Sequence, residues 1–326
     1  MVIKPRMPSL RVRKQKALLN RISPNHKMRS VIMADLPKWE SGYRGEKDVD
    51  YYLDFIANEK FHILHDVRLL NNHAFQMDTL IICPNFILIM EVKNWSGTIY
   101  FDAQFDQVIR TDENGKVERF SNPLTQVHLQ RVQLMKWLQN KNLSHIPIEI
   151  ALIFSNPKAI LKASDDMPLD SLKQIRHLDQ IFQMTLELEE KYKKIRLNHV
   201  SLKKLSSLIL QYDTPLFIDI LKTFQINRSD IIKGVQCPGC LKFAMKRAHG
   251  KWICPHCSIS SKTAHHQAIE DFFLLFNSQL NNKSCRDFLL LSSRGAATRI
   301  LASMNLIPTG NFRGRKYRYS FIDRVP

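Results

Sequence analysis

Apolar side chains gather in two neighbouring runs, residues 76–82 and 89–95, on either side of the pair Pro84-Asn85. Leu, Ile and Val dominate both runs, as is typical of buried β-strands, and Pro and Asn favour a turn between them. We therefore predict an antiparallel hairpin. If the hairpin turns symmetrically about Pro84-Asn85, Asp78 lies directly opposite Glu91.

Three ionisable side chains of this hairpin share one face. Side chains alternate along a strand, so Lys93 points to the same side as Glu91, with Asp78 across from them. Like charges directly opposite each other destabilise a sheet, and this arrangement calls for an explanation. The hairpin either presents a solvated face with a chance Lys–Glu ion pair, or it holds a divalent-metal site. In the second interpretation the two carboxylates supply oxygen ligands and the lysine assists the attack of water on a phosphate.

A helical period precedes the hairpin. Val49, Leu53 and Ile56 recur at a spacing near that of a helix and predict a helix over residues 45–58. Glu46 begins the buried stripe of this helix. By itself, that position indicates only a favourable interaction with the helix dipole.

The other periodic segments complete a core domain over residues 39–160. Pro123 starts a helix that reaches about residue 140, and Gln126 lies one turn into it. The remaining patterns predict, in chain order, a strand at 61–67, a β region at 97–120 with a turn at 113–115, and a buried strand at 148–154. This order of helices and strands predicts an α/β (α+β) fold, followed by a mostly helical segment over 161–230.

The charge of the chain indicates a polyanionic partner. The 326 residues carry a formal net charge of +18, and the sequence pI is about 9.7. Such a field favours nucleic acid first and an anionic membrane surface second. No apolar run reaches the ~18–20 residues of a membrane span, and the N-terminus lacks the pattern of a secretory signal. We therefore expect a cytoplasmic protein that binds nucleic acid, with DNA favoured, and that binds no membrane.

Residues 1–38 form a basic N-terminal segment. Its first 30 residues contain nine Lys or Arg side chains and no Asp or Glu. The pattern fits a solvated arm or an arm that contacts nucleic acid, and it fits a membrane-surface helix less well because aromatic side chains are absent. Contacts of such an arm with phosphates add affinity without sequence specificity.

Two C-x-x-C pairs predict a zinc ribbon over residues 231–262. The pairs are Cys237 with Cys240 and Cys254 with Cys257, separated by thirteen residues. Four thiolates make a closed, structural Zn²⁺ site with no open position for catalysis, and redox-active or unbound thiols are the alternative. Six Lys or Arg residues and no acid lie within this segment, so the ribbon is a candidate surface for DNA or RNA.

The last segment, residues 263–326, has the outline of a winged-helix module. The pattern predicts three short helices followed by a basic, Tyr-bearing turn over residues 311–320. Such a module places a helix in the major groove and contacts phosphates with its wing, whereas a small helical cap on the ribbon is the alternative. The residues that we expect to contact nucleic acid are Arg294, Arg299, Arg313, Arg315, Lys316 and Arg318.

Four motifs follow one another along the core at residues 40–155. They are Gly42-x-x-Gly45-Glu46, Gln76-Met77-Asp78, Glu91-Val92-Lys93-Asn94-Trp95-x-Gly97 and Asn122-Pro123-x-x-Gln126. This set resembles the NERD (nuclease-related) domain, a branch of the PD-(D/E)xK, or restriction-endonuclease-like, superfamily. The resemblance implies a mixed central sheet flanked by helices. It also implies a Mg²⁺ or Mn²⁺ site surrounded by Glu46, Asp78, Glu91, Lys93 and Gln126.

The resemblance further implies a metal-dependent nuclease that hydrolyses phosphodiester bonds, with DNA as the favoured substrate. Asp78 and Glu91 then bind the metal, and Lys93 positions the attacking water or stabilises charge on the phosphate. Glu46 holds a second metal or a metal-bound water, and Gln126 orients Lys93 or the phosphate. Two other functions stay open, because a fold does not prove an activity. One is a non-catalytic DNA- or RNA-binding protein that uses this core as a scaffold, and the other is a protein-interaction hub with basic tails.

Overall fold

The chain folds into two compact units, each built from two separate stretches of sequence. Unit 1 combines Met1–Met7 with Glu40–Leu216, and unit 2 combines Pro8–Trp39 with the described residues from Phe217 onward. The computed structural model describes residues 1–143, 145–276, 279–311 and 314–319. In that part of the chain, no helix has both the length and the apolar character needed to cross a membrane.

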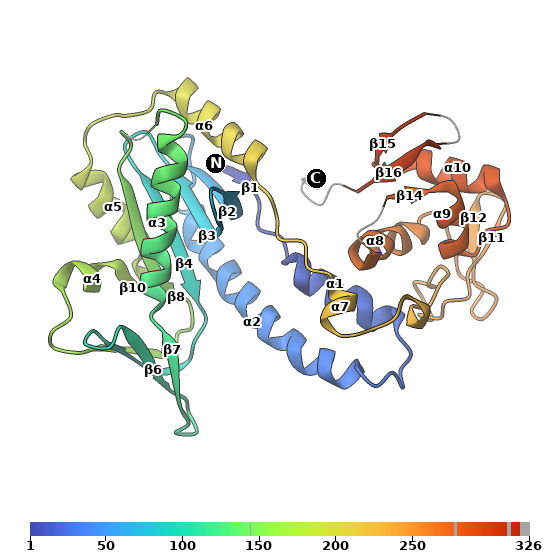
Figure 1. Cartoon of the computed structure of the whole chain (residues 1–326), viewed down its shortest axis with the longest axis horizontal. Coiled ribbons are helices and arrows are strands. Elements are labelled where there is room, and N and C mark those ends of the chain that lie inside the picture. The colour runs from blue at the N-terminus through green and yellow to red at the C-terminus, as the bar shows by residue number, and fades with distance from the viewer. Residues whose placement is uncertain (144, 277–278, 312–313, 320–326) are drawn as a thin grey trace. The chain divides into compact units, whose positions relative to one another are not determined.

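A six-stranded sheet forms the centre of unit 1 (Figure 1). Its strands are β1 Val2–Lys4, β2 His62–Leu70, β3 Ala74–Ile82, β4 Ile87–Lys93, β8 Ile148–Phe154 and β10 Ile175–His177. They lie side by side in the order β1-β2-β3-β4-β8-β10. Pairing is antiparallel from β2 through β3 to β4, whereas β1 is parallel to β2, β8 to β4 and β10 to β8. The structure therefore confirms the predicted mixed central sheet.

Helices cover both faces of this sheet. They are α2 Arg29–Asp54, α3 Pro123–Gln139, α5 Ile181–Lys191 and α6 His199–Tyr212. Helices α3 and α6 pack on one face, while α5 and the part of α2 that belongs to unit 1 pack on the other. Leu80 and Ile82 pack in the core under α3 and α6, whereas Ile81 packs in the core under α2 and α5. This is the alternation of side chains that a strand requires. Unit 1 thus has three layers, and this confirms the predicted α/β class.

A second, four-stranded sheet extends unit 1 in the order β7-β6-β5-β9. Its strands are β5 Gly97–Asp102, β6 Gln107–Thr111, β7 Val117–Ser121 and β9 Ala159–Ala163. The predicted turn at 113–115 connects β6 to β7, and Gly115 adopts a φ of +79° there, which glycine accepts without strain. The predicted β region is therefore confirmed. The short strands β9 and β10 carry no clear sequence signal and were not predicted.

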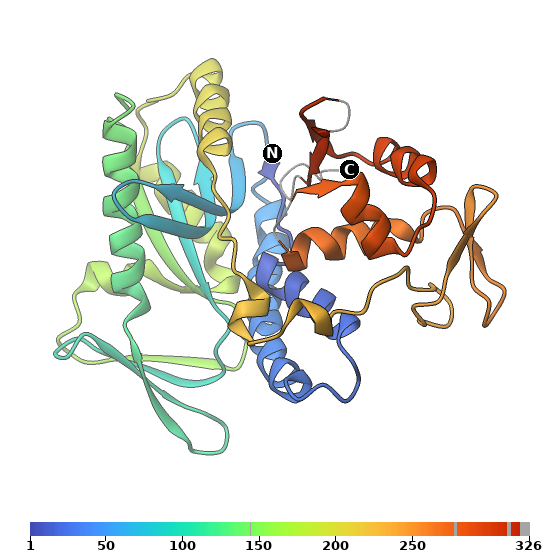
Figure 2. The ribbon, with the colours of Figure 1, turned by 45° about the vertical axis from the view of Figure 1, so that its right-hand side comes forward.

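Unit 2 contains a small ribbon and a C-terminal module (Figure 2). The ribbon is a three-stranded sheet of β11 Lys246–Ala248, β12 Lys251–Ile253 and β13 Ser260–Ser261. The C-terminal module comprises α8 His265–Phe276, β14 Leu280–Asn281, α9 Asn282–Leu289, α10 Arg294–Ser303, β15 Ile307–Thr309 and β16 Lys316–Arg318. In this module β16 pairs with both β14 and β15. A helix, a short strand, two helices and a hairpin follow one another, which is the predicted winged-helix outline.

The core of unit 2 joins both of its stretches. Leu18 of α1 (Leu10–Arg21) packs in one cluster with Trp252 of the ribbon, Phe272 of α8 and Ile300 of α10. Two short helical elements of unit 2 lie between these parts in the sequence, α7 Ile220–Thr223 and η2 Arg228–Asp230. Unit 1 also has two short helical elements, α4 Leu169–Gln174 and η1 Leu178–Gln180. The ribbon and the C-terminal module therefore share one hydrophobic core.

The N-terminal segment differs from the expected solvated arm. Val2–Lys4 pairs with β2, and the side chains of Arg6, Lys14 and Arg21 are buried. Each of these cations has a partner that is distant in sequence. Arg21, for example, forms a 2.7 Å ion pair with Asp271, and the two side chains are each 1% exposed. Because the partners lie 40 to 250 residues away along the chain, the local excess of charge gives no sign that the segment folds.

Helix α2 also differs from its predicted bounds. It begins at Arg29 rather than near residue 45 and ends at Asp54. Pro37 and Gly42 lie inside it, and both residues usually indicate a break. Glu46 therefore lies in the middle of a 26-residue helix, and the proposed interaction with a helix N-terminus is wrong.

Candidate active site and cysteine cluster

The hairpin of β3 and β4 has the predicted register. Thr79 pairs with Met90, and Leu80 pairs with Ile89. Extended by one residue, this register places Asp78 opposite Glu91. Asp78 Oδ2 accepts a 2.9 Å hydrogen bond from the backbone N–H of Val92. This bond holds the Asp78 carboxylate at the end of the pairing, on the sheet face that α3 covers.

Glu91 is the most buried acid of the predicted set, with 3% of the residue exposed. Its Oε1 accepts hydrogen bonds from Lys93 Nζ at 2.6 Å and from Gln126 Nε2 at 2.8 Å. Its Oε2 accepts a 2.9 Å bond from Gln130 Nε2. Lys93 Nζ also lies 3.4 Å from Gln126 Oε1. The structure thus brings Glu91, Lys93 and Gln126 into one network, and it adds Gln130, which stands one helical turn after Gln126 on α3.

Glu46 reaches the same region from α2, where an arginine from the N-terminus holds it. Arg6 Nη1 donates to Glu46 Oε2 at 2.8 Å, and Arg6 Nε donates to Asp50 Oδ1 at 3.0 Å. Arg6 Nη2 contacts both His65 Nδ1 and Thr79 Oγ1 at 2.8 Å. The Arg6 side chain is only 2% exposed.

Sequence reasoning missed Arg6 because it is one of many cations in the N-terminal segment. Forty residues separate it from Glu46, and no local pattern connects the two. Gln130 was also missed, although its spacing from Gln126 places both on one face of α3. That spacing is a signal that sequence analysis can use.

The acids of the site oppose one another electrostatically. Burial raises the pKa of Asp78 well above its usual value, and the neighbouring carboxylates of Glu91 and Glu46 raise it further. Burial also raises the pKa of Glu46, although the charge of Arg6 offsets part of this effect. Burial and the charge of Arg6 lower the pKa of His65 to about 3, so this histidine is neutral at physiological pH. The site therefore concentrates negative charge that a cation would relieve.

The donor atoms of the site suit a hard divalent cation. Carboxylate oxygens are the ligands that Mg²⁺ and Mn²⁺ prefer. Asp78 Oδ1 has no hydrogen-bond partner among the described residues, and Glu91 Oε2 accepts a single bond, so each acid keeps a free acceptor position. Asp78 and Glu91 therefore fit such an ion. Glu46 forms an ion pair with Arg6. Among the described residues, Glu46, Asp78 and Glu91 do not bring three carboxylate oxygens close enough together to form a three-ligand metal site.

Gly45 sets the distance between α2 and the end of β4. A Cβ atom at this position would lie 2.4 Å from Asn94 Cβ and 2.5 Å from Ser155 Oγ. Asn94 follows Lys93 directly, and its Nδ2 donates a 2.9 Å hydrogen bond to the backbone oxygen of Ser41 on α2. The absence of a side chain at Gly45 therefore brings the helix that carries Glu46 close to the strand that carries Lys93.

The four ribbon cysteines meet at one point in unit 2. The sulfur atoms of Cys237, Cys240, Cys254 and Cys257 all lie within 4.8 Å of one another. Backbone N–H groups, first of Cys240 and then of Gly239, lower the pKa of the Cys237 thiol to about 6 and favour the thiolate. Four convergent sulfurs at this spacing fit a structural metal ion in a zinc-ribbon-like module.

The predicted nucleic-acid-binding residues lie at several places in the C-terminal module. Arg294 and Arg315 line a cavity of about 500 Å³ together with Lys283 and Arg286. Arg299 lines a different cavity, beside the ribbon. Lys316 and Arg318 lie exposed on β16, and Arg313 lies outside the described residues.

This fold and this cluster of acids and lysine define a nuclease-like α+β domain with an appended cysteine ribbon. Residues 41–155 match the family model of the nuclease-related domain, NERD. An uncharacterized protein of Bacillus anthracis is 28% identical over 140 residues, or 41% of this chain. The alignment covers 61% of that relative, so the chain spans about three fifths of its length. No solved structure matches the chain.

Proposed function

We propose that this protein is a Mg²⁺-dependent nuclease that hydrolyses phosphodiester bonds, with DNA as its substrate. The observation that carries the proposal is the convergence of Asp78, Glu91 and Lys93 on one sheet face, within a nuclease-related domain. Two carboxylates and one lysine at this spacing supply metal ligands and a positive charge beside them. The net charge of +18 supports a polyanionic substrate.

Each side chain of the proposed site has a different role in hydrolysis. A divalent ion such as Mg²⁺ or Mn²⁺, when bound to Asp78 and Glu91, supplies Lewis-acid chemistry and lowers the pKa of a bound water. Lys93 orients the attacking water or donates to the phosphate oxygen on which charge develops. Gln126 and Gln130 fix the orientation of Glu91 through its two oxygens.

Glu46 and Arg6 form the second part of the proposed site. Glu46, which accepts a hydrogen bond from Arg6, would orient a water at the site or help to hold a second ion from the α2 side. Arg6 acts through Glu46 and is therefore a positioning residue. Zn²⁺ in the cysteine cluster has a structural role, and the basic residues of the C-terminal module bind nucleic acid.

One observation favours a second candidate function. Lys93 and Arg6 already form ion pairs with Glu91 and Glu46, so two of the three acids are neutralised by the protein itself. Such a core also serves a non-catalytic protein that binds DNA or RNA through its basic surfaces. This alternative requires tight, salt-dependent binding without cleavage.

Cleavage of defined substrates tests the proposal. Supercoiled plasmid, linear duplex, single-stranded DNA and RNA are incubated with Mg²⁺, Mn²⁺ or EDTA, and wild type is compared with Asp78→Ala and Lys93→Ala. Zinc content and circular dichroism establish that each variant is folded. We expect metal-dependent cleavage of DNA that both substitutions abolish. Tight binding without cleavage of any substrate supports the scaffold function, and cleavage that survives both substitutions contradicts the proposed site.

A further inference from the structure

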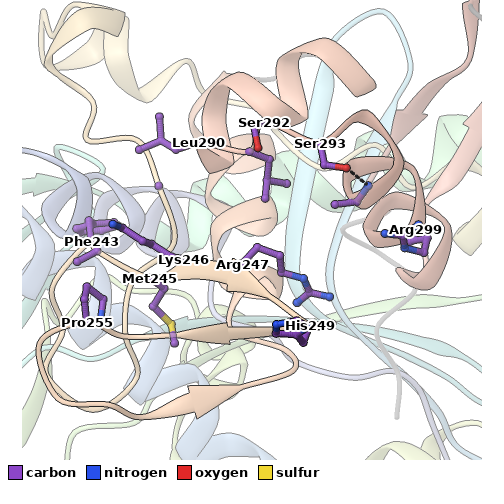
Figure 3. Close-up of a pocket in the computed structure, with 15 residues that line it drawn as sticks. Phe243, Met245, Lys246, Arg247, His249, Pro255, Leu290, Ser292, Ser293 and Arg299 are labelled. Atoms are coloured by element: carbon purple, nitrogen blue, oxygen red, sulfur yellow. Dashed lines mark hydrogen bonds between the residues drawn. The ribbon is translucent and has the colours of Figure 1, made fainter.

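A second cavity in unit 2 is separate from the proposed active site (Figure 3). It has a volume of about 730 Å³, which lies within the range of about 300–1,000 Å³ typical of ligand pockets. Residues 243–250 of the ribbon line one side, and residues 290–293 with the start of α10 line the other. Residues of both the ribbon and the C-terminal module line it.

Three basic side chains, Arg247, His249 and Arg299, lie at one end of the cavity, whereas Lys246 extends toward Phe243 (Figure 3). None of the described residues that line the cavity is acidic. Burial lowers the pKa of Arg247, and the nearby charge of Arg299 lowers it further. The buried Nη1 of Arg247 has no hydrogen-bond partner among the described residues. Two guanidinium groups thus share a cavity that offers them no counter-charge, an arrangement that an anion completes.

Apolar side chains form the opposite end. In Figure 3, Phe243, Pro255 and Leu290 lie away from Arg247 and Arg299. Leu290 is 67% exposed and adopts a φ of +57° at the end of α9, an uncommon position for a leucine. Exposed apolar side chains beside unpaired cations suit a ligand that has both a flat apolar group and an anionic group.

We propose that this cavity binds one unpaired nucleotide of a nucleic-acid strand, with the phosphate between Arg247 and Arg299 and the base against Phe243 and Leu290. A paired base cannot reach the apolar end, because stacking on a side chain requires a free face. The inference rests on the proposed binding of nucleic acid, but it uses none of the residues of the core domain. It gives the ribbon and the C-terminal module a joint preference for single-stranded segments.

Fluorescence anisotropy tests this assignment with a labelled 12-nucleotide single strand and the matching duplex. The full-length chain is titrated without added Mg²⁺, so that binding is measured apart from cleavage. Arg247→Gln and Arg299→Gln are compared with Lys262→Gln, which removes the same charge from an exposed ribbon position outside the cavity. Leu290→Asn removes the apolar surface while keeping a residue that tolerates the left-handed backbone.

We expect each arginine variant to weaken single-strand binding about fivefold or more and to lower the salt slope by about one, whereas Lys262→Gln stays within about twofold. Leu290→Asn should weaken binding of the single strand and leave the duplex unchanged. Equal affinities of Lys262→Gln and of both arginine variants for the single strand would overturn the proposal. It would also be overturned if Leu290→Asn weakened binding of the single strand and of the duplex to the same extent. Zinc content shows that each variant keeps its ribbon.

The result also separates this inference from the proposed function. Wild type that cleaves DNA while both arginine variants bind normally contradicts the cavity assignment alone. Wild type that binds through the cavity but cleaves no substrate contradicts the nuclease alone.

Discussion

At the scale of single residues, the acids of the site occupy positions that their own charges oppose. Asp78 is half-buried and faces Glu91 and Glu46, and the Val92 N–H donates one hydrogen bond to it. When the Asp78 carboxyl is ionised among these other carboxylates, it lowers the stability of the fold.

Replacing Asp78 should therefore stabilise the protein while abolishing its activity. The raised pKa of Asp78 means that the folded state prefers the protonated carboxyl. The stability that this preference contributes is present below the ordinary pKa of about 4 and is lost as pH rises through the raised value. At pH 7.5, without metal, Asp78→Asn removes the destabilising charge, and we expect the melting temperature to rise by about 2–4 °C.

Differential scanning calorimetry at pH 4 and pH 7.5 checks this prediction. The difference between variant and wild type should shrink at pH 4, where both side chains are neutral. Added Mg²⁺ should stabilise wild type and not the variant, because a ligand stabilises only the state that binds it. A lower melting temperature for Asp78→Asn at pH 7.5 would show that the carboxylate stabilises the fold.

Arg6 positions Glu46 from outside the segment that matches the nuclease-related domain. Arg6→Lys keeps the charge but cannot contact Glu46, Asp50, His65 and Thr79 together. We expect kcat to fall about 10–100-fold, as is typical when a residue supporting a metal site is changed. The hydrogen bond from Arg6 lowers the pKa of Glu46 in addition to the effect of the Arg6 charge, so the loss of this bond should move the acidic limb of the pH–rate profile to higher pH. Arg44→Lys, at an exposed position on α2, the helix that carries Glu46, is the control and should leave the profile unchanged.

At the scale of elements, the close approach of α2 to β4 determines whether Glu46 and Lys93 meet. The helix is long and contains Pro37 and two glycines, so its own helix propensity is weak. Packing of Val49 and Leu53 against the sheet, together with the hydrogen bond from Asn94 to Ser41, holds it in place. A side chain at the contact point would therefore disturb the site.

The two glycines of α2 provide a matched test of this contact. Gly45→Ala places a Cβ 2.4 Å from Asn94 Cβ, and we expect a loss of stability of about 1–3 kcal/mol together with reduced cleavage. Gly42→Ala meets no atom within 4 Å and should instead stabilise the helix by about 0.5–1 kcal/mol. Urea denaturation and plasmid cleavage measure both effects. Equal behaviour of the two variants would mean that α2 can move away from β4 without cost.

At the scale of the whole molecule, the proposed active site belongs to one compact unit and the cysteine cluster to the other, and each unit has its own core. The cysteine cluster belongs to the core of unit 2, where Cys237 and Cys254 are buried among apolar side chains. The residues of the proposed active site all belong to unit 1. Loss of the ribbon metal should therefore affect the two units differently.

Cys240→Ser tests this separation. We expect the ratio of zinc to protein to fall from about one toward zero, because four thiolates are needed to close a structural site. The calorimetric transition of unit 2 should move to lower temperature, while that of unit 1 stays within about 2 °C of wild type. Cys285→Ser, at a buried cysteine outside the cluster, controls for the loss of a thiol and should retain the metal. A single transition that shifts as a whole would show that the two units unfold together.

The sequence alone determined the features that local spacing encodes. The turn at Pro84-Asn85 determined the register that brings Asp78 opposite Glu91, and the two C-x-x-C pairs determined which sulfurs meet. Alternation and helical period also predicted the helices and strands of the α/β core, because both are properties of neighbouring residues. The mixed central sheet came from the resemblance to the nuclease-related domain and not from these periods.

Only the tertiary structure decided which distant residues complete these features. Arg6 reaches Glu46 across forty residues, and Arg21 reaches Asp271 across 250, so that cations expected in a solvated arm are buried. The structure likewise brings Arg247 of the ribbon together with Arg299 of α10. A local pattern cannot report such contacts, because burying a charge is favourable only when the folded chain supplies its partner.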